Sequence, residues 1–577
     1  MKYQARLISH LKNERYEPKG LDGVIDVLRI DEPDRFKAEV QSMRAEGVIE
    51  ITPKGHLVLP SVAVMEGELV GVFKGTSRGF GFVRPEGVFR EGDIFIPPDA
   101  TADALSGDVV RIGFERDRRR ERRVQDGQPS FSGWVEEVLE RRRGQFTGEI
   151  FKQGSQWLVA PDGSVIRGPI VVRDAGAKNV KPGDKVVLEL VEYAKDNELA
   201  EGVITRVLGE AGRPDVETEA VIAAYSLPGE FPEACIEQAR QASRAFDEQV
   251  EQWEREGASS LHLRTDKTDE LILTIDPPDA KDFDDAIGIK KLDNGGWELG
   301  VYIADVAHFI EPGSALDVEG ASRGNSVYLP RLVIPMLPEV LSNGICSLQE
   351  GVPRFVKAAY KRYDRNGNRV AEGVGQALIK SRKRLTYLEA QALIEGNPEE
   401  AEKHARTEAK YDDDVVAALH DMDDLAKAIH ARRKRQGMLS LDLPEVELVF
   451  DEEGHVIDAV PEDDAFTHTL IEMFMVEANE VAARLFEDLD VPLIRRVHPE
   501  PTPGDAEGVQ RTAMVAGFRV PQHPTREELQ GLLEATKGTP AARAVHMAVL
   551  RTLTKAEYAP SLVGHFALAS DAYAHFT

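Results

Sequence analysis

The first part of the chain alternates apolar and polar residues with the period of a helix. This pattern predicts helices over residues 5–12, 21–30 and 35–46. Two short apolar runs, 48–51 and 56–59, flank the turn sequence Pro-Lys-Gly and predict a β-hairpin. Three helices followed by a hairpin are typical of a winged-helix module, which we expect over residues 1–62. Such a module either contacts nucleic acid or serves as a folded cap, and the pattern favours neither.

The pattern then changes to short apolar strands separated by glycine and proline turns. A first group of strands is predicted at residues 69–73, 80–83, 93–96 and 109–114. A second group is predicted at residues 145–151, 157–160, 170–172, 185–193 and 200–207. Short strands in this rhythm are typical of OB-type barrels of the cold-shock kind. We therefore expect one barrel over residues 66–125 and a second over residues 132–210.

The remaining residues, 215–577, mix helical and strand patterns and predict one large domain. Helical segments continue to Glu256, and apolar strands follow at residues 271–275 and 297–303. An amphipathic helix is expected over residues 467–485. The expected fold class is therefore multidomain α+β, with a winged helix, two OB-type barrels and a large mixed α+β domain.

Composition narrows the class of protein. The formal net charge of −29 argues against indiscriminate polyanion binding, so any nucleic-acid site must be a local patch. No apolar run is long enough to span a membrane. The two cysteines, Cys235 and Cys346, cannot form a disulfide framework or a zinc site. These features predict a soluble protein of the reducing cytoplasm.

The densest candidate chemistry follows the predicted strand at residues 271–275. Pro277 and Pro278 exclude a helix after this strand, and the resulting loop carries five carboxylates between Asp276 and Asp285. Ionised carboxylates packed this closely repel one another and are costly to bury, unless a divalent cation compensates them. Oxygen-only ligands suit Mg²⁺ or Mn²⁺, and two such ions form the usual clamp for phosphodiester hydrolysis.

Two other interpretations of this loop can be weighed against the residues around it in the sequence. Solvated acidic loops are common, but the apolar strand before this loop and Ala286-Ile287 after it indicate burial. A phosphatase-type aspartyl nucleophile requires a second Asp two residues after Asp276 and a Thr two residues further on. The chain has Pro278 and Ala280 at those positions, which favours the cation site.

The first barrel carries a candidate RNA-contact face. Strand alternation places Phe80 and Phe82 on one side, Phe95 can join them from the next strand, and Lys74 and Arg78 flank the group. Exposed aromatic rings beside basic residues suit stacking on single-stranded bases, which contributes about 1–3 kcal/mol per base. The alternative is that these rings belong to the core. Nearby valines and isoleucines already supply an inner face, so RNA contact is favoured.

Two arginine-rich runs, 116–123 and 141–143, lie near the expected boundary between the barrels. Acidic residues are interleaved with the first run. The runs are either a solvated linker or a linker that contacts phosphates, and the sequence leaves both interpretations open.

The aspartate loop closely resembles the catalytic motif of the ribonuclease II and ribonuclease R family of processive 3′-to-5′ exoribonucleases. Asp276, Asp282, Asp284 and Asp285 match the family's four catalytic aspartates in spacing. The resemblance implies that these residues hold Mg²⁺, with Mn²⁺ as the alternative, and two ions in all. We expect Asp276 and Asp285 to hold one ion, and Asp284 to position the attacking water.

Other segments extend the resemblance. Tyr328 lies where the family has the tyrosine that stacks on the 3′-terminal nucleotide. Glu472 and Asn479 share one helix face and resemble the helix whose glutamate contacts that nucleotide. The leading winged helix favours the ribonuclease R branch. The resemblance implies single-stranded RNA, or structured RNA with a 3′ overhang, as the substrate and nucleoside 5′-monophosphates as products.

The family pattern continues beyond Thr577 with a segment that carries an arginine near the scissile phosphate, so we expect an incomplete catalytic domain. The alternative function is therefore an RNA-binding chain impaired in cleavage, because loss of one charge donor typically costs about 10²–10³ in rate. A DNA-binding regulator would leave the aspartates unexplained. We expect a cytoplasmic monomer whose partner is RNA, with no membrane contact.

Overall fold

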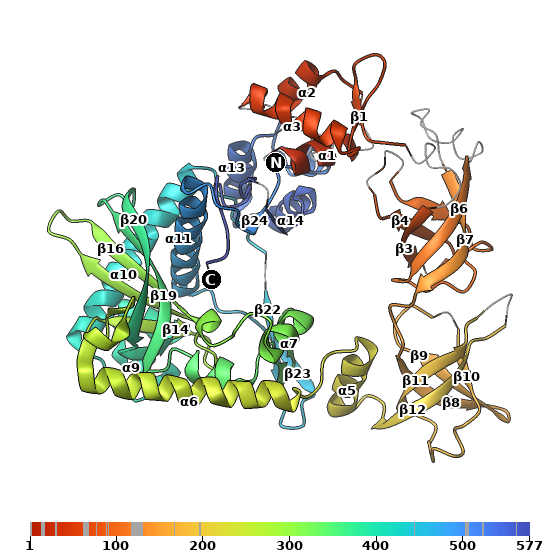
Figure 1. The fold of residues 1–577 in the computed structure, drawn as a ribbon, viewed down its shortest axis with the longest axis horizontal. Coiled ribbons are helices and arrows are strands. Elements are labelled where there is room, and N and C mark those ends of the chain that lie inside the picture. Colours follow the sequence, from red (N-terminus) through yellow and green to blue (C-terminus); the bar gives the residue numbers. More distant parts are fainter. Residues whose placement is uncertain are drawn as a thin grey trace.

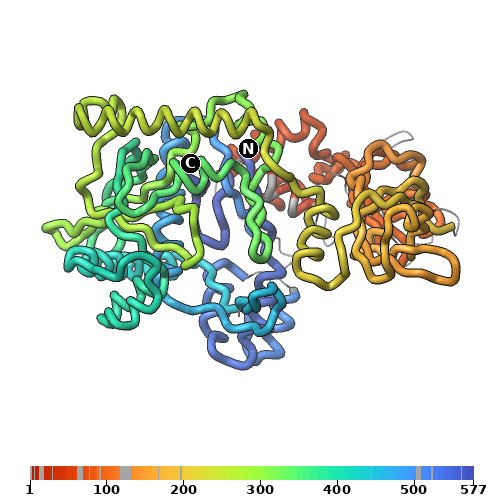
Figure 2. Tube along the Cα trace, turned by 90° about the horizontal axis from the view of Figure 1, so that it is seen from below, coloured from red at the N-terminus to blue at the C-terminus, as the bar shows by residue number. Residues whose placement is uncertain are grey.

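The computed structural model describes residues 3–576 except for several segments. These segments are residues 13–17, 29, 31, 62–68, 77, 88, 90–91, 117–130, 167, 195–197, 444, 502–506, 522–523 and 561. The described residues form a multidomain α+β protein, as the sequence predicts. Both barrels lie to one side of a large domain (Figures 1 and 2). No described helix is long and apolar enough to cross a membrane.

The N-terminal module has the arrangement of a winged helix. Its helices are α1 (Gln4–Lys12), α2 (Leu21–Val27) and α3 (Pro33–Ala45), and its hairpin is β1 (Glu50–Ile51) with β2 (Leu57–Val58). One fully buried residue from each helix meets the others in the core: Leu7, Val24 and Phe36. The helices and hairpin that the apolar pattern predicts are therefore confirmed.

Two closed five-stranded barrels follow. The first has the order β3-β4-β5-β7-β6, and its strands are β3 (Leu69–Gly75), β4 (Gly81–Pro85), β5 (Ile94–Ile96), β6 (Val109–Arg116) and β7 (Phe131–Glu140). The second has the order β10-β12-β11-β8-β9, and its strands are β8 (Phe146–Gln153), β9 (Gln156–Pro161), β10 (Ile170–Val172), β11 (Asp184–Glu192) and β12 (Glu201–Glu210).

The strand β7 lies in the first barrel, although all of its residues except Phe131 fall in the range 132–210 expected for the second barrel. It pairs along its length with β6, and Ser132 lies beside Phe95 of β5. A fifth strand is needed to close this barrel. The pattern of apolar residues does not indicate this fifth strand, because residues 117–130, which separate the two partner strands in sequence, are mostly charged or polar.

The large domain is built on a mixed seven-stranded sheet in the order β13-β20-β19-β16-β15-β14-β21. Its strands are β13 (Thr265–Asp266), β14 (Ile272–Asp276), β15 (Asp285–Lys291), β16 (Trp297–Ala304), β19 (Pro353–Tyr363), β20 (Arg369–Lys380) and β21 (Lys383–Thr386). Helices cover both faces of this sheet (Figure 1). β14 is consequently buried on both sides, with Ile272 facing one layer and Leu273 the other.

One helical layer contains α8 (Tyr387–Ile394), α9 (Pro398–His404), α10 (Asp413–Arg435) and α11 (Phe466–Asp488). The opposite layer contains α6 (Glu233–Glu256), α7 (Ala315–Arg323) and the π-helix η4 (Val340–Ile345). The helix α5 (Pro214–Ala224) packs on the second barrel and leads into α6. The predicted strand at 271–275 and helix at 467–485 are thus confirmed: the strand is β14 of the sheet, and the helix is α11 of one covering layer.

Smaller elements complete the domain. Two hairpins pair β17 (Val327–Leu329) with β18 (Leu332–Ile334) and β22 (Val446–Phe450) with β23 (Val456–Pro461). A separate apolar cluster gathers α12 (Glu507–Val515), α13 (Arg526–Thr536) and α14 (Ala542–Thr552). β24 (Arg495–Val497) pairs with β25 (Glu557–Ala559). Cys235 and Cys346 are free and buried, so neither forms a disulfide.

Candidate active site

The four predicted aspartates lie in and beside the loop that joins β14 to β15. Asp276 ends β14, and Asp285 begins β15. The two strands are antiparallel neighbours, with Leu273 beside Ile287, so the chain returns to the same edge of the sheet. The fold therefore brings Asp276 and Asp285 to one place and suspends Asp282 and Asp284 in the connection between them.

The loop is held in shape from the segment after η4. The Ser347 hydroxyl accepts a hydrogen bond from the Phe283 N–H at 3.1 Å and donates one to the Lys281 carbonyl at 2.9 Å. The Leu348 N–H donates to the Phe283 carbonyl at 2.8 Å. Phe283 is itself buried. These contacts hold the backbone of Lys281 and Phe283, on either side of Asp282.

The electrostatics of the loop favour a compensating cation. Burial, and then the negative charge of Asp285, raise the pKa of Asp276 to about 8. Burial and the charge of Asp284 raise the pKa of Asp285 to about 6. Desolvation and the charge of Asp282 also raise the pKa of Asp284. The ionised form of all three carboxylates is therefore disfavoured in this loop. A cation among them would stabilise the ionised form of each.

An unpartnered atom supports the same fit. The Oδ2 atom of Asp276 is buried, and it has no hydrogen-bond partner among the described residues. An unsatisfied buried carboxylate oxygen is costly, so it is expected to serve as a ligand. The neighbouring donors are carboxylates, which are the ligands that Mg²⁺ and Mn²⁺ prefer. The residues present therefore suit a hard divalent cation.

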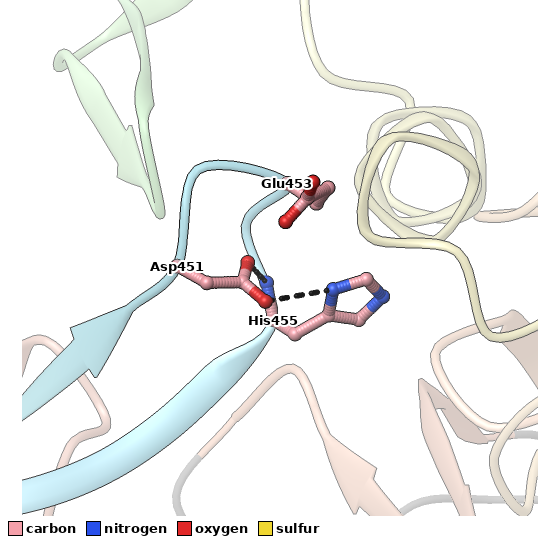
Figure 3. Close-up of side chains that lie close together, drawn as sticks. All are labelled: Asp451, Glu453 and His455. Carbon is pink, nitrogen blue, oxygen red and sulfur yellow. Dashed lines mark hydrogen bonds and ion pairs between the residues drawn. The ribbon is translucent and has the colours of Figure 1, made fainter.

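A tighter group of potential metal ligands lies elsewhere. Among the described residues, Asp451, Glu453 and His455 bring three ligand atoms within 4.8 Å of one another, in the turn between β22 and β23 (Figure 3). Asp451 accepts a hydrogen bond from the His455 N–H at 2.7 Å and lies 3.3 Å from Nδ1 of its ring. These contacts close the hairpin turn. The Asp451–His455 pair thus has a structural explanation that requires no ion, whereas Glu453 is exposed and takes no part in these contacts.

Tyr328 reaches the aspartate loop from the β17–β18 hairpin. Its hydroxyl donates a hydrogen bond to Oδ2 of Asp282 at 3.2 Å. Its side chain remains 67% exposed, so the ring is accessible to a ligand. The tyrosine that the sequence singles out is therefore placed beside the aspartates, although 43 residues separate it from Asp285.

The two predicted residues of α11 lie in different surroundings. Glu472 is exposed, and desolvation raises its pKa although the charge of Arg433 opposes that shift. The Asn479 side chain donates to the Tyr573 hydroxyl at 3.0 Å and accepts from the Phe576 N–H at 2.6 Å. Asn479 thus ties α11 to residues 573–576. Contact of either residue with a nucleotide stays a prediction.

The predicted aromatic face is present on the first barrel. The ring centroids of Phe80, Phe82 and Phe95 lie 5.6–5.8 Å from one another. All three rings are half-buried, and Lys74, which lies beside Phe82 across the strands, is exposed, as is Arg78. The buried core of the barrel contains Phe73 and other residues instead. Most of the arginine-rich run 116–123 lies outside the described residues.

Arg384 of β21 is a neighbour of the aspartates that sequence reasoning missed. Its guanidinium lies 4.5 Å from the centre of the Phe283 ring, and its Nη2 donates to the carbonyls of Pro278 and Ala280 at 3.3 and 3.2 Å. Its charge opposes the rise in the pKa of Asp276. β21 runs parallel to β14, and no local pattern indicates that pairing.

Replacing Arg384 with glutamine is expected to lower RNA cleavage by about 10- to 100-fold, the usual cost of losing a residue that orients metal ligands. RNA affinity measured in a chelating buffer should stay unchanged, because Arg384 faces the loop backbone. Arg382→Gln is the matched control, since Arg382 is exposed and pairs with Asp412 at 2.9 Å. Equal cleavage rates in both variants would contradict the positioning role.

A buried ion network behind the site was also missed. Glu477 of α11 is fully buried, and it pairs with Lys361, Arg432 and Arg433 and accepts a hydrogen bond from the Tyr363 hydroxyl at 2.7 Å. Burial opposes ionisation, but the three cations lower the pKa of Glu477. The network joins β19, α10 and α11. Lys361 lies on β19, and Arg432 and Arg433 lie in the last turn of α10.

Comparison with known proteins places these features in a family. The RNB domain matches residues 264–577, a cold shock domain matches residues 158–232, and the ribonuclease B OB domain matches residues 71–126. The RNB match covers the aspartate loop, Tyr328 and α11.

Relatives match over most of the chain. Ribonuclease R of Thermotoga maritima is 38% identical over 77% of this chain and 61% of its own length. Ribonuclease R of Aquifex aeolicus is 30% identical over 94% of this chain and 72% of its own length. Mycoplasma genitalium RNase R, solved in complex with ribose-methylated single-stranded RNA, superposes with a TM-score of 0.77 at 28% identity, over 88% of this chain and 76% of that chain. This chain therefore belongs to the RNB-domain family, in which it is similar to ribonucleases R.

Proposed function

We propose that this chain is a divalent-cation-dependent exoribonuclease that hydrolyses single-stranded RNA, or structured RNA with a 3′ overhang, from the 3′ end and releases nucleoside 5′-monophosphates. The observation that carries the proposal is the aspartate loop at the end of β14. Its buried, unpartnered Asp276 oxygen and its raised carboxyl pKa values suit a cation that acts on a phosphodiester. The family match and the RNA-bound relative support RNA as the substrate.

The four aspartates have separate roles in the proposal. Asp276 ends β14 and Asp285 begins the neighbouring β15, and together they would hold one Mg²⁺, or Mn²⁺. Asp282 and Asp284 would complete the cluster, which we expect to hold two ions. Divalent cations held by these residues would activate a water molecule for attack near neutral pH and would offset the negative charge that develops on the phosphate. Asp284 is accessible to solvent, and partial desolvation and then the charge of Asp282 raise its pKa. A carboxylate that water can reach suits the role of orienting the attacking water.

Tyr328 and Glu472 would bind the terminal nucleotide. The Tyr328 ring is exposed beside Asp282, so a base stacked on it would lie next to the aspartates. Glu472 would accept hydrogen bonds from the ribose hydroxyls, which distinguish RNA from DNA. Asn479, whose side chain is engaged by Tyr573 and Phe576, would support this helix face through those contacts.

The aromatic face of the first barrel would hold RNA away from the reacting end. Phe82→Ala is expected to weaken binding of single-stranded RNA by about tenfold, because one stacked base is worth about 1–3 kcal/mol. Fluorescence anisotropy in a chelating buffer measures this loss without cleavage. Trp134→Ala is the control, since Trp134 is an exposed aromatic residue on β7 outside the Phe80, Phe82 and Phe95 group. Equal affinities in the two variants would exclude the aromatic face as an RNA site.

Linear and circular forms of one RNA sequence test the mode of attack. An exonuclease that requires a 3′ end should degrade the linear form in Mg²⁺ and leave the circular form intact. Neither form should be degraded in a chelating buffer. Cleavage of the circle would indicate an endonuclease and would contradict the proposal.

A further inference from the structure

An open groove lies between the first barrel and the end of α5, away from the aspartate loop. It encloses about 390 Å³. Val72 of β3 lines one side, Arg142 and Arg143 of the link between the barrels line another, and Tyr225 with Ser226 closes the third. The groove therefore lies where the first barrel, the link between the barrels and the end of α5 meet.

The side chains of the groove combine positive charge with an exposed aromatic ring. The Arg143 guanidinium lies 5.3 Å from the centre of the Tyr225 ring, and Tyr225 is 65% exposed. Arg142 is 60% exposed and lies 3.9 Å from a carboxylate oxygen of Glu140, an exposed pair that contributes little. In the part of the chain that the structure describes, Arg143 makes no ion pair with a carboxylate.

Arginines beside an exposed aromatic ring favour a ligand that has both negative charge and planar rings. The formal net charge of the chain is −29. Two arginines with little neighbouring negative charge therefore make the groove a locally positive site on an acidic protein. Arginine pairs with phosphates, and both guanidinium and phenol rings stack on nucleobases. An acidic peptide would satisfy the arginines but would leave the Tyr225 ring unused.

The groove is continuous with the aromatic face of the first barrel. Val72 and Lys74 are exposed on the outer side of β3, where Lys74 lies beside Phe82 and Val72 beside Arg84 of β4. A strand of RNA stacked on the phenylalanines therefore reaches Lys74 and then Val72 at the edge of the groove. Arg142, Arg143 and Tyr225 extend the same basic and aromatic surface toward α5.

We infer that this groove binds the backbone phosphates and one base of single-stranded RNA that leaves the aromatic face. Arg142 and Arg143 contact the phosphates, and the exposed side of the Tyr225 ring stacks on the base. The inference rests on the proposed function, because it takes single-stranded RNA as the ligand. It adds a binding site that lies outside both the aspartate loop and the Phe80, Phe82 and Phe95 group.

RNA binding by three variants of the full chain tests the groove. The probe is a labelled oligoadenylate of about 20 nucleotides, long enough to pass more than one OB barrel, in a chelating buffer. Arg143→Gln is expected to weaken binding about threefold to tenfold and to reduce the slope of log K against log salt by about 0.7, the share of one phosphate contact. Tyr225→Leu should weaken binding at least about fivefold without changing that slope, whereas Tyr225→Phe should retain affinity.

Arg173→Gln is the matched control, because Arg173 is an exposed arginine on the second barrel that pairs with Glu201. If the wild type and Phe82→Ala differ but Arg143→Gln matches Arg173→Gln, the groove inference fails and the proposed function stands. If the wild type does not bind the probe at all, the proposed function fails as well. Competition by polyglutamate with no effect of Tyr225→Leu would identify an acidic-peptide groove and overturn the RNA assignment.

Discussion

Replacing Asp284 with asparagine is expected to lower RNA cleavage by about 10³-fold or more, while RNA affinity stays within a few-fold of the wild type. The reason is that Asp284 is exposed at the aspartate loop, where it can orient the attacking water, and makes no contact with the aromatic face that would hold the RNA. Single-turnover cleavage in Mg²⁺ measures the rate, and anisotropy in a chelating buffer measures the affinity.

The same loop provides the control for that variant. Asp279 is an exposed carboxylate three residues after Asp276, and it falls outside the four matched positions. Asp279→Asn should therefore cleave RNA at nearly the wild-type rate, although it removes the same charge from the same loop. A cleaving Asp284→Asn variant, or an equally inactive Asp279→Asn variant, would overturn the roles assigned to these aspartates.

Asp276→Asn is expected to stabilise the protein in the absence of divalent cations. The pKa of Asp276 is about 8 in the folded chain, against an ordinary value of about 4. The folded state therefore binds a proton that the unfolded state releases, and stability falls as the pH rises from about 4 to about 8. Asparagine is neutral at every pH, so this loss is absent in the variant.

Thermal unfolding in a chelating buffer measures the effect. At pH 8.5 the midpoint of Asp276→Asn should exceed that of the wild type by at least about 2 °C, and the difference should shrink toward pH 5. Mg²⁺ should raise the midpoint of the wild type more at pH 8.5 than at pH 6, because cation binding competes with protons. The variant should lose most of this Mg²⁺ shift. A variant that is less stable than the wild type at pH 8.5, or equally stabilised by Mg²⁺, would contradict the cation site.

The features that the sequence predicts well are those that a short segment specifies. The aspartate loop is marked by an apolar strand, two prolines and closely spaced carboxylates within seventeen residues, and the structure places it at the end of a central strand. The aromatic face follows from strand alternation in a single hairpin, and β4 and β5 place Phe82 beside Phe95. Local periodicity also predicts α11 and the N-terminal helices, because each buries one face.

Long-range pairing accounts for what the sequence does not indicate. Arg384 reaches the aspartate loop because β21 pairs in parallel with β14, more than a hundred residues earlier in the chain. Glu477 is buried only because Lys361, Arg432 and Arg433 converge on it from β19 and α10. β7 closes the first barrel across a charged stretch that interrupts the strand rhythm. Tyr328 was indicated by resemblance alone, since an isolated tyrosine in a proline-rich segment carries no pattern of its own.

A time course with RNA labelled at its 5′ end tests the central claim most directly. In Mg²⁺ the wild-type chain should shorten the labelled RNA progressively from the 3′ end to a short 5′ product, and a chelator or Asp284→Asn should stop the shortening. Intact RNA that shifts on a native gel would contradict the claim and would identify a chain that binds RNA without cleaving it. Internal fragments from the earliest time points would contradict it differently, by indicating an endonuclease.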